Sequence, residues 1–135
     1  MVLKQLSLLF YSMWVKAVEV VSVVKGKRVL FQARVADSFL TRVKGLMFSR
    51  EVTPLLFVFE REARVKNSIH SFFCQPFDAV FLTSERVVSD VFVNVPCFKP
   101  FIAPSRDVKY LLELPAFTAK QEELKQGDVL RWKSV

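Results

Sequence analysis

The sequence predicts a mainly β (α+β) fold, a compact barrel or jelly-roll-like sandwich of about nine short strands with two short helices. Three observations lead to this fold class. Short runs of β-branched and aromatic residues recur along the chain, prolines and glycines separate them, and no regular β-α alternation points to a parallel α/β sheet. The length of 135 residues, 52% of them hydrophobic and 24% charged, is that of one globular domain.

The first predicted elements are a hairpin and a helix. Residues 14–24 and 27–36 are rich in β-branched side chains, and Lys25-Gly26 between them is typical of a tight turn. Asp37-Ser38 then offers an N-cap for a short helix, because apolar residues follow with i, i+3, i+4 spacing. Gly45 is placed to end that helix.

Three buried strands are expected next, at residues 55–59, 69–74 and 77–82. Each is a short apolar run with several aromatic or β-branched side chains. Pro54 and Pro76 bound them, since proline is poorly tolerated inside a central strand. The last two runs are separated by a short proline turn, so we expect them to pair.

The C-terminal third predicts strands at 87–95, 108–114 and 128–132. Between the last two, residues 118–125 are expected to form a helix that opens with a Thr-x-x-Gln capping box. Gly127 is placed to terminate that helix. No internal repeat or linker divides the chain.

Residues 1–13 are expected to be an N-terminal extension, and residues 14–135 a single β domain. The uncharged stretch at 5–15 is too short to span a bilayer, which takes about 20 apolar residues in a helix. As a secretory signal it lacks a good small-residue cleavage site, and Met13 offers an alternative translation start. We therefore expect a cytoplasmic protein without a transmembrane segment, or an exported one if this stretch acts as a signal.

The composition excludes several kinds of chemistry. Three scattered glycines cannot form a dinucleotide fingerprint, a phosphate loop or a nucleophile elbow. One histidine with Cys74 and Cys97 cannot build a four-ligand zinc site of the cysteine/histidine kind. We expect no metal and no cofactor, and both cysteines are expected to remain reduced and to pack as small apolar groups.

The net charge of +7 resides in the first fifty residues, which contain nine Lys and Arg residues and two acidic residues. The rest of the chain contains eleven basic and eleven acidic residues and is neutral. One interpretation is a nucleic-acid-binding module acting through this basic N-terminal third. The charges are spread over several elements, which favours solvated strand and helix ends. Fourteen phenylalanines, nine of them from Phe57 to Phe101, are expected to pack the core rather than to form a stacking platform for single-stranded nucleic acid.

Several short motifs follow one another in a fixed order over most of the chain. They are Ala36-Asp37-Ser38, Arg42, Gly45-Leu46-Met47, Arg50, Leu56-Phe57-Val58-Phe59, Ile69-His70-Ser71-Phe72-Phe73, Pro76-Phe77-Asp78-Ala79-Val80-Phe81-Leu82, Lys99-Pro100, Tyr110-Leu111-Leu112-Glu113-Leu114-Pro115 and Gly127-Asp128. In this order they resemble domain-of-unknown-function family 192, small archaeal and bacterial proteins, over roughly residues 28–131. The resemblance implies a compact, mainly β, barrel-like or jelly-roll-like domain with a helix between its opening strands. It implies no reaction.

Five polar residues are candidates for a ligand-binding site at the barrel mouth: Arg42, Arg50, His70, Asp78 and Glu113. We predict a non-catalytic β domain that binds a small ligand or a protein partner, because no complete catalytic set assembles from the sequence. The alternative is a small hydrolase- or isomerase-type enzyme that uses His70 with Asp78 or Glu113 as acid and base. Each residue also has a structural interpretation: the histidine fixes a strand end, and an arginine pairs with a carboxylate.

Overall fold

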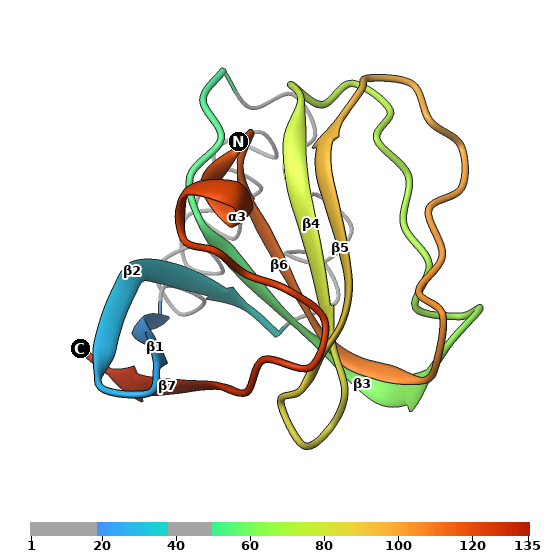
Figure 1. Ribbon diagram of the computed structural model, residues 1–135. Coiled ribbons are helices and arrows are strands. Elements are labelled where there is room, and N and C mark those ends of the chain that lie inside the picture. The colour runs from blue at the N-terminus through green and yellow to red at the C-terminus, as the bar shows by residue number, and fades with distance from the viewer. Residues whose placement is uncertain (1–18, 38–49) are drawn as a thin grey trace, which may run out of the picture.

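The computed structural model describes residues 19–37 and 50–135, and it confirms the mainly β fold. Seven strands form one sheet in the order β5-β4-β6-β3-β2-β1-β7, accompanied by the short helix α3 (Figure 1). Neighbouring strands are antiparallel except β2 and β3, which are parallel. The elements are β1 (Glu19–Lys25), β2 (Arg28–Ala36), β3 (Leu55–Ala63), β4 (Phe77–Leu82), β5 (Val88–Val95), β6 (Val108–Pro115), α3 (Thr118–Gln121) and β7 (Leu130–Ser134).

The sheet curls until its two edge strands, β5 and β7, approach each other. A single antiparallel bridge joins Val87 to Val129, just before each of these strands. The N–H of Val88 donates to the carbonyl of Asp128 at 2.8 Å, which reinforces the contact. One bridge is not a continuous ladder, so the sheet is barrel-like but not closed.

The predicted hairpin is present as β1 and β2. Gly26 adopts φ 62° at the turn, a backbone conformation that glycine adopts without steric cost. Alternating valines and alanines on the two strands point into the core, as the period-2 pattern requires. The residues before Glu19 and the predicted helix that ends at Gly45 lie outside the described part of the chain.

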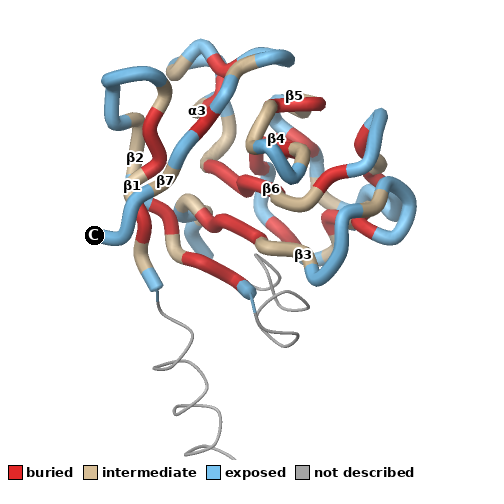
Figure 2. The backbone as a smooth tube through the Cα atoms, turned by 90° about the horizontal axis from the view of Figure 1, so that it is seen from below, coloured by how far each residue is buried: buried red, intermediate tan, exposed pale blue. Residues whose placement is uncertain are grey.

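Apolar side chains cover both faces of the sheet. One cluster gathers Val23, Leu82 and Leu112 with the underside of α3, and the other gathers Phe77, Phe81 and Leu111 on the opposite face. All six residues of β4 are buried, because this strand has neighbours on both sides and both faces (Figure 2). The central strands therefore form a continuous core through the molecule.

The prediction of a strand at residues 69–74 is wrong. This segment is part of the loop between β3 and β4 and contributes one bridge, from Ile69 to Ile102. The N–H of Cys74 donates to the carbonyl of Ser71 in a turn, and Phe73 adopts φ 59°. Turn geometry therefore overrides the β-propensity of the aromatic residues, which reflects packing on a sheet more than backbone preference. Within the described ranges this leaves seven strands, against about nine expected.

Candidate functional site

Asp78 lies on β4 with its side chain completely buried. Its Oδ1 accepts hydrogen bonds from the backbone N–H groups of Asn94 at 2.8 Å and Phe117 at 2.9 Å. Its Oδ2 accepts a third from the N–H of Ala119 at 2.8 Å. The register between β4 and β5 shifts at this point, so the carboxylate satisfies a donor freed by the bulge.

The same carboxylate replaces the predicted capping box of α3. No side chain of the helix caps its N-terminus; the N-cap residue is Phe117, with φ 71°. The helix is also shorter than expected and ends at Gln121. Because Asp78 joins β4, β5 and the start of α3 through three backbone donors, its lone pairs are committed to the fold.

Glu113 lies on β6 next to Asp78 in the sheet but on the opposite face. Ala79 pairs with Glu113 and Asp78 pairs with Leu114, so strand alternation points the two carboxylates away from each other. Glu113 is only 6% exposed, and its Oε2 has no hydrogen-bond partner. Burial raises the pKa of this carboxyl to about 8, since desolvation disfavours the charged form.

Cys74 belongs to the same side of the sheet as Glu113. It packs with Phe77 and Leu111 in the second core cluster, and its Sγ lies 3.4 Å from the carbonyl oxygen of Phe72. Burial first, and then the negative charges of Glu113 and Cys97, raise the pKa of the Cys74 thiol to about 11. Cys74 is therefore a protonated thiol near neutral pH and a poor nucleophile.

His70 and Arg50 are both exposed. The Nδ1 of His70 accepts a hydrogen bond from the N–H of Phe72 at 3.1 Å, so the ring is held by its own loop. Arg42 lies outside the described residues. The structure does not bring His70, Asp78 and Glu113 together: the first is on an outer loop, and the two carboxylates are buried on opposite faces of the sheet.

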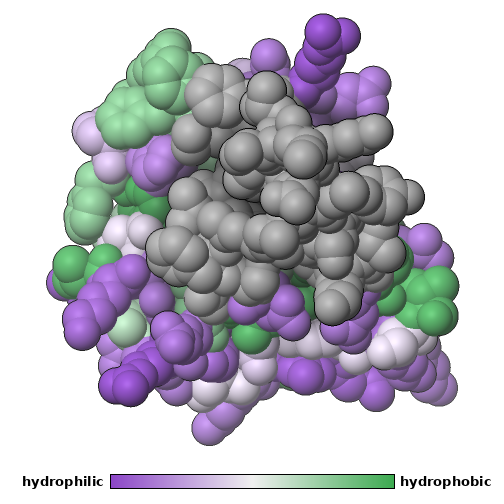
Figure 3. Space-filling view, turned by 180° about the vertical axis from the view of Figure 1, so that it is seen from behind, coloured by the Kyte–Doolittle hydropathy of each residue, from purple (hydrophilic) through white to green (hydrophobic). Residues whose placement is uncertain are grey.

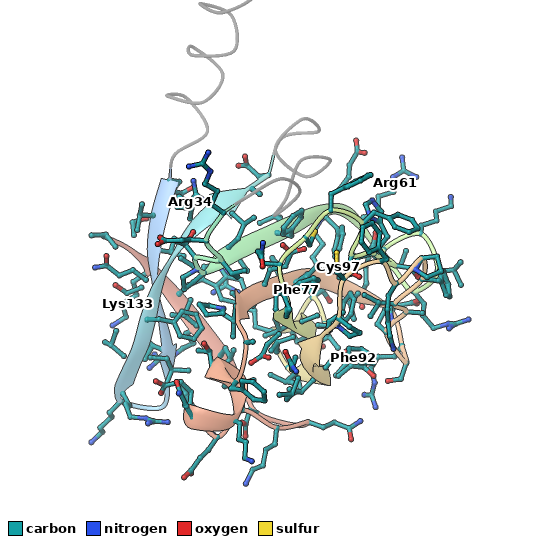
Figure 4. The ribbon with its side chains drawn as sticks, turned by 90° about the horizontal axis from the view of Figure 1, so that it is seen from above. Arg34, Arg61, Phe77, Phe92, Cys97 and Lys133 are labelled. Atoms are coloured by element: carbon teal, nitrogen blue, oxygen red, sulfur yellow. The ribbon has the colours of Figure 1, made fainter. Side chains whose placement is uncertain are left out.

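Two of the basic residues in the first third of the chain are paired with acids from the last third. The Nζ of Lys25 lies 2.9 Å from a carboxylate oxygen of Asp128, and Arg28 lies 3.4 Å from one of Glu122. These cations are thus partly neutralised where the hairpin meets the segment after α3. In the view from above, Arg34 and Lys133 lie on this side of the molecule, whereas Cys97 and Arg61 lie on the other (Figure 4).

On that other side, the β3–β4 loop (residues 64–76) and the β5–β6 loop (residues 96–107) run beside each other (Figure 1). Ser71, which is fully buried, joins them. Its Oγ donates to the carbonyl of Pro96 at 2.6 Å and accepts from the N–H of Lys99 at 2.8 Å, and its backbone carbonyl accepts from the N–H of Phe98. Together with the bridge from Ile69 to Ile102, these bonds fix the two loops as one unit.

This unit carries a group of aromatic rings, His70, Phe72, Phe73 and Phe98, which we call the aromatic patch. Ring centroids lie 5.1 Å apart between His70 and Phe72, 6.4 Å between Phe72 and Phe98, and 5.7 Å between Phe73 and Phe98. Phe98 is 60% exposed and Phe73 is 54% exposed; Phe101, on the same loop, is 61% exposed. Hydrophobic side chains gather on this side at the upper left of Figure 3.

Sequence reasoning missed the aromatic patch because phenylalanine is usually a core residue. The signal lay in the context: Phe72-Phe73 precedes Cys-Gln-Pro, and Phe98 and Phe101 flank Pro100. Such positions favour turns, and turns lie at the surface of a protein. Within residues 19–37 and 50–135, no group of three His, Cys, Asp or Glu side chains is arranged to hold a metal ion.

Residues 20–132 match the sequence profile of domain-of-unknown-function family 192, described as uncharacterised. The chain belongs to family 192. It is 36% identical to UPF0127 protein PF1050 of Pyrococcus furiosus over 112 residues, which cover 82% of this chain and 95% of the relative. It is 34% identical to UPF0127 protein PH1112 of Pyrococcus horikoshii, over 75% of this chain and 87% of that protein.

Two solved structures share the family 192 fold. A candidate transcription regulator from Sinorhizobium meliloti superposes with a TM-score of 0.73 at 26% identity, over 84% of this chain and 92% of that one. A protein of unknown function from Novosphingobium aromaticivorans gives the same TM-score at 23% identity, over 84% of each chain. Within the described ranges, no helix has the length and apolar character needed to span a bilayer.

Proposed function

We propose that this member of family 192 is a non-catalytic β domain that binds its partner through the aromatic patch. The observation that carries the proposal is the grouping of exposed phenylalanine rings that two joined loops hold at strained turns. Phe73 and Phe98 adopt φ 59° and 65°, a left-handed conformation that is uncommon for bulky residues. Backbone strain and an exposed ring both oppose folding, and such features gather at functional sites.

The loops that carry the patch also select the charge of the partner. They hold four exposed cations, Arg64, Lys66, Lys99 and Arg106, against one carboxylate, Asp107 at the junction with β6. Among the residues that the structure describes, none of these four cations forms an ion pair. Lys99 adjoins the patch, and the other three cations lie at the far end of the two loops, next to β3 and β6. Loops that combine an apolar group with a net positive charge favour a partner that is both apolar and negatively charged.

The enzyme alternative has less support. It requires His70 to work with Asp78 or Glu113, but the carboxylate of Asp78 already accepts three backbone hydrogen bonds. Glu113 is buried on the second core face, whereas His70 is exposed on a loop. A general acid and base must both reach the reacting atoms, which this arrangement does not favour.

Two small probes with the same ring test the proposed function. Phenyl phosphate is an apolar anion and benzylammonium an apolar cation. In an NMR titration, phenyl phosphate should shift the backbone amides of residues 70–74 and 97–101, and benzylammonium should not. Phe98→Asn should weaken the response without strain, since asparagine tolerates the left-handed conformation.

Phe117→Asn is the matched control. Phe117 is also a phenylalanine in the left-handed conformation, 48% exposed, but it lies at α3 and outside the patch. This variant should respond to phenyl phosphate like the wild type. Equal shifts with both probes would contradict the preference for a negatively charged partner. Shifts confined to another surface, or no shift at all, would contradict a binding role for the patch.

Nucleic-acid binding is a second candidate function. It is favoured by the description of the Sinorhizobium meliloti protein as a candidate transcription regulator. Binding through the basic N-terminal third would have to compete with the ion pairs of Lys25 and Arg28. Gel retardation of single- and double-stranded oligonucleotides at low salt tests it, because counterion release makes such binding strongly salt-dependent.

A further inference from the structure

We infer that the partner of the aromatic patch is the surface of an anionic lipid bilayer, into which the two loops insert their phenylalanine rings. This inference rests on the proposed function and specifies its partner. It follows from three properties of the loops: the way their rings pack, the net positive charge that they carry and the rigidity of their junction.

The rings of the patch pack against one another rather than lying open. Phe73 and Phe98 meet edge to face with their planes at 76°, and Phe72 is tilted by 52° from Phe98. A platform for single-stranded nucleic acid needs ring faces that are free to stack on bases. Rings that meet at such steep angles do not form one flat platform; they form instead a compact apolar projection, which suits insertion between lipid headgroups.

The two loops carry a net positive charge. Lys99 immediately follows Phe98 beside the patch, whereas Arg64, Lys66 and Arg106 lie at the other end of the loops, next to β3 and β6. Each lysine or arginine near an anionic leaflet contributes about 1 kcal/mol of attraction. The affinity for a membrane is the sum of apolar burial and this attraction. The cations are therefore needed, because one or two inserted rings alone give only marginal membrane affinity.

The junction between the loops makes the projection rigid. Ser71 is buried and joins both loops through its hydroxyl group and its backbone carbonyl. Beneath it, Ile69, Cys74 and Ile102 pack on the second core cluster. The loops are therefore anchored on their inner side, so insertion of their outer side orders little additional chain.

Vesicle co-sedimentation of the full chain tests the inference. Vesicles of phosphatidylcholine alone are compared with vesicles that contain about 30% phosphatidylglycerol. The wild type should bind the anionic vesicles much more tightly, and added salt should weaken binding. Phe98→Asn should reduce the partition coefficient about tenfold or more, as expected for a ring that no longer leaves water.

Two further variants test the contribution of charge and the specificity for the patch. Lys99→Gln should reduce binding to anionic vesicles about fivefold, the equivalent of about 1 kcal/mol. Phe117→Asn should bind like the wild type, because that ring lies outside the patch. Circular dichroism confirms that each variant is folded before its binding is measured.

The outcomes distinguish this inference from the proposed function. If phenyl phosphate binds the patch but anionic vesicles do not, the bilayer inference is wrong and the binding role stands. If a short oligothymidylate binds and loses affinity in Phe98→Asn while vesicles do not bind, the partner is nucleic acid. If neither phenyl phosphate nor vesicles bind, both proposals fail. Vesicle binding unchanged in Phe98→Asn also overturns the inference.

Discussion

Replacing Glu113 by glutamine should make the protein more stable at alkaline pH. Glu113 is buried beside apolar strands, and its Oε2 has no hydrogen-bond partner. Burial raises its pKa from 4.5 to about 8, so the folded state holds the proton more tightly than the unfolded chain does. The stability linked to this proton is complete below about pH 4.5 and is lost as the pH rises through about 8.

The magnitude follows from the shift in pKa. Each unit corresponds to about 1.4 kcal/mol, so the stability linked to this proton falls by about 3 kcal/mol by pH 7, where mainly the unfolded chain is ionised, and by about 4 to 5 kcal/mol above pH 8. Glutamine has nearly the same shape and no charge to desolvate. Glu113→Gln should therefore match the wild type near pH 5 and exceed its free energy of unfolding by a few kcal/mol near pH 8.5.

Urea unfolding between about pH 5 and pH 8.5 measures this difference directly, because the midpoint and slope give the free energy at each pH. The range stops below pH 9, where the Cys74 thiol would begin to contribute because burial raises its pKa from 9.0 to about 11. Glu85→Gln is the control: Glu85 is exposed in a turn, and its replacement should leave the pH dependence unchanged. A difference between Glu113→Gln and wild type that stays constant with pH would refute the reasoning.

Three more predictions follow from the hydrogen bonds and thiols. Asp78→Ala should lower the free energy of unfolding by about 3 kcal/mol or more, because three buried N–H groups lose their acceptor; a loss below 1 kcal/mol in urea unfolding would contradict this. Ser71→Ala should lower the free energy of unfolding by about 1 to 3 kcal/mol and should speed hydrogen exchange at the Lys99 amide, because both hydrogen bonds of the hydroxyl are lost. Unchanged exchange would show that the hydroxyl does not hold the loops together. In the native protein, iodoacetamide should modify Cys97 well before Cys74, since Cys74 is buried and its pKa is raised. Mass spectrometry of tryptic peptides measures the order of modification, and modification of Cys74 first would contradict the prediction.

The strands were predictable where the sequence pattern is strong. The bounds of β4 agree with the apolar run at 77–82, and the hairpin of β1 and β2 turns at Lys25-Gly26 as expected. The run at 69–74 was not predictable from its composition, because one turn at Ser71 removes it from the sheet. Sequence periodicity cannot show which partner a backbone donor will choose.

The candidate site was harder to predict than the fold. Asp78 and Glu113 look equivalent in the sequence, each a single carboxylate in an apolar strand, and only the register of β4 against β6 places them on opposite faces. The donors around Asp78 come from β5 and from the start of α3, up to 41 residues away in the chain. Tertiary hydrogen bonds of this kind leave no local signature. The exposed phenylalanines escaped prediction for a related reason, since their exposure depends on backbone conformation rather than on residue type.

The position of β7 beside β1 has a consequence for synthesis on the ribosome. Val23 pairs with Trp132 and Lys25 with Leu130, so β1 completes its second row of hydrogen bonds only with residues made about a hundred positions later. Until then the nascent hairpin presents a valine-rich strand with an open edge, a form prone to pairing with other chains. The same hairpin carries Lys25 and Arg28, whose acidic partners are also synthesised late. Their charge repels neighbouring nascent hairpins during the interval and is neutralised when the fold is complete.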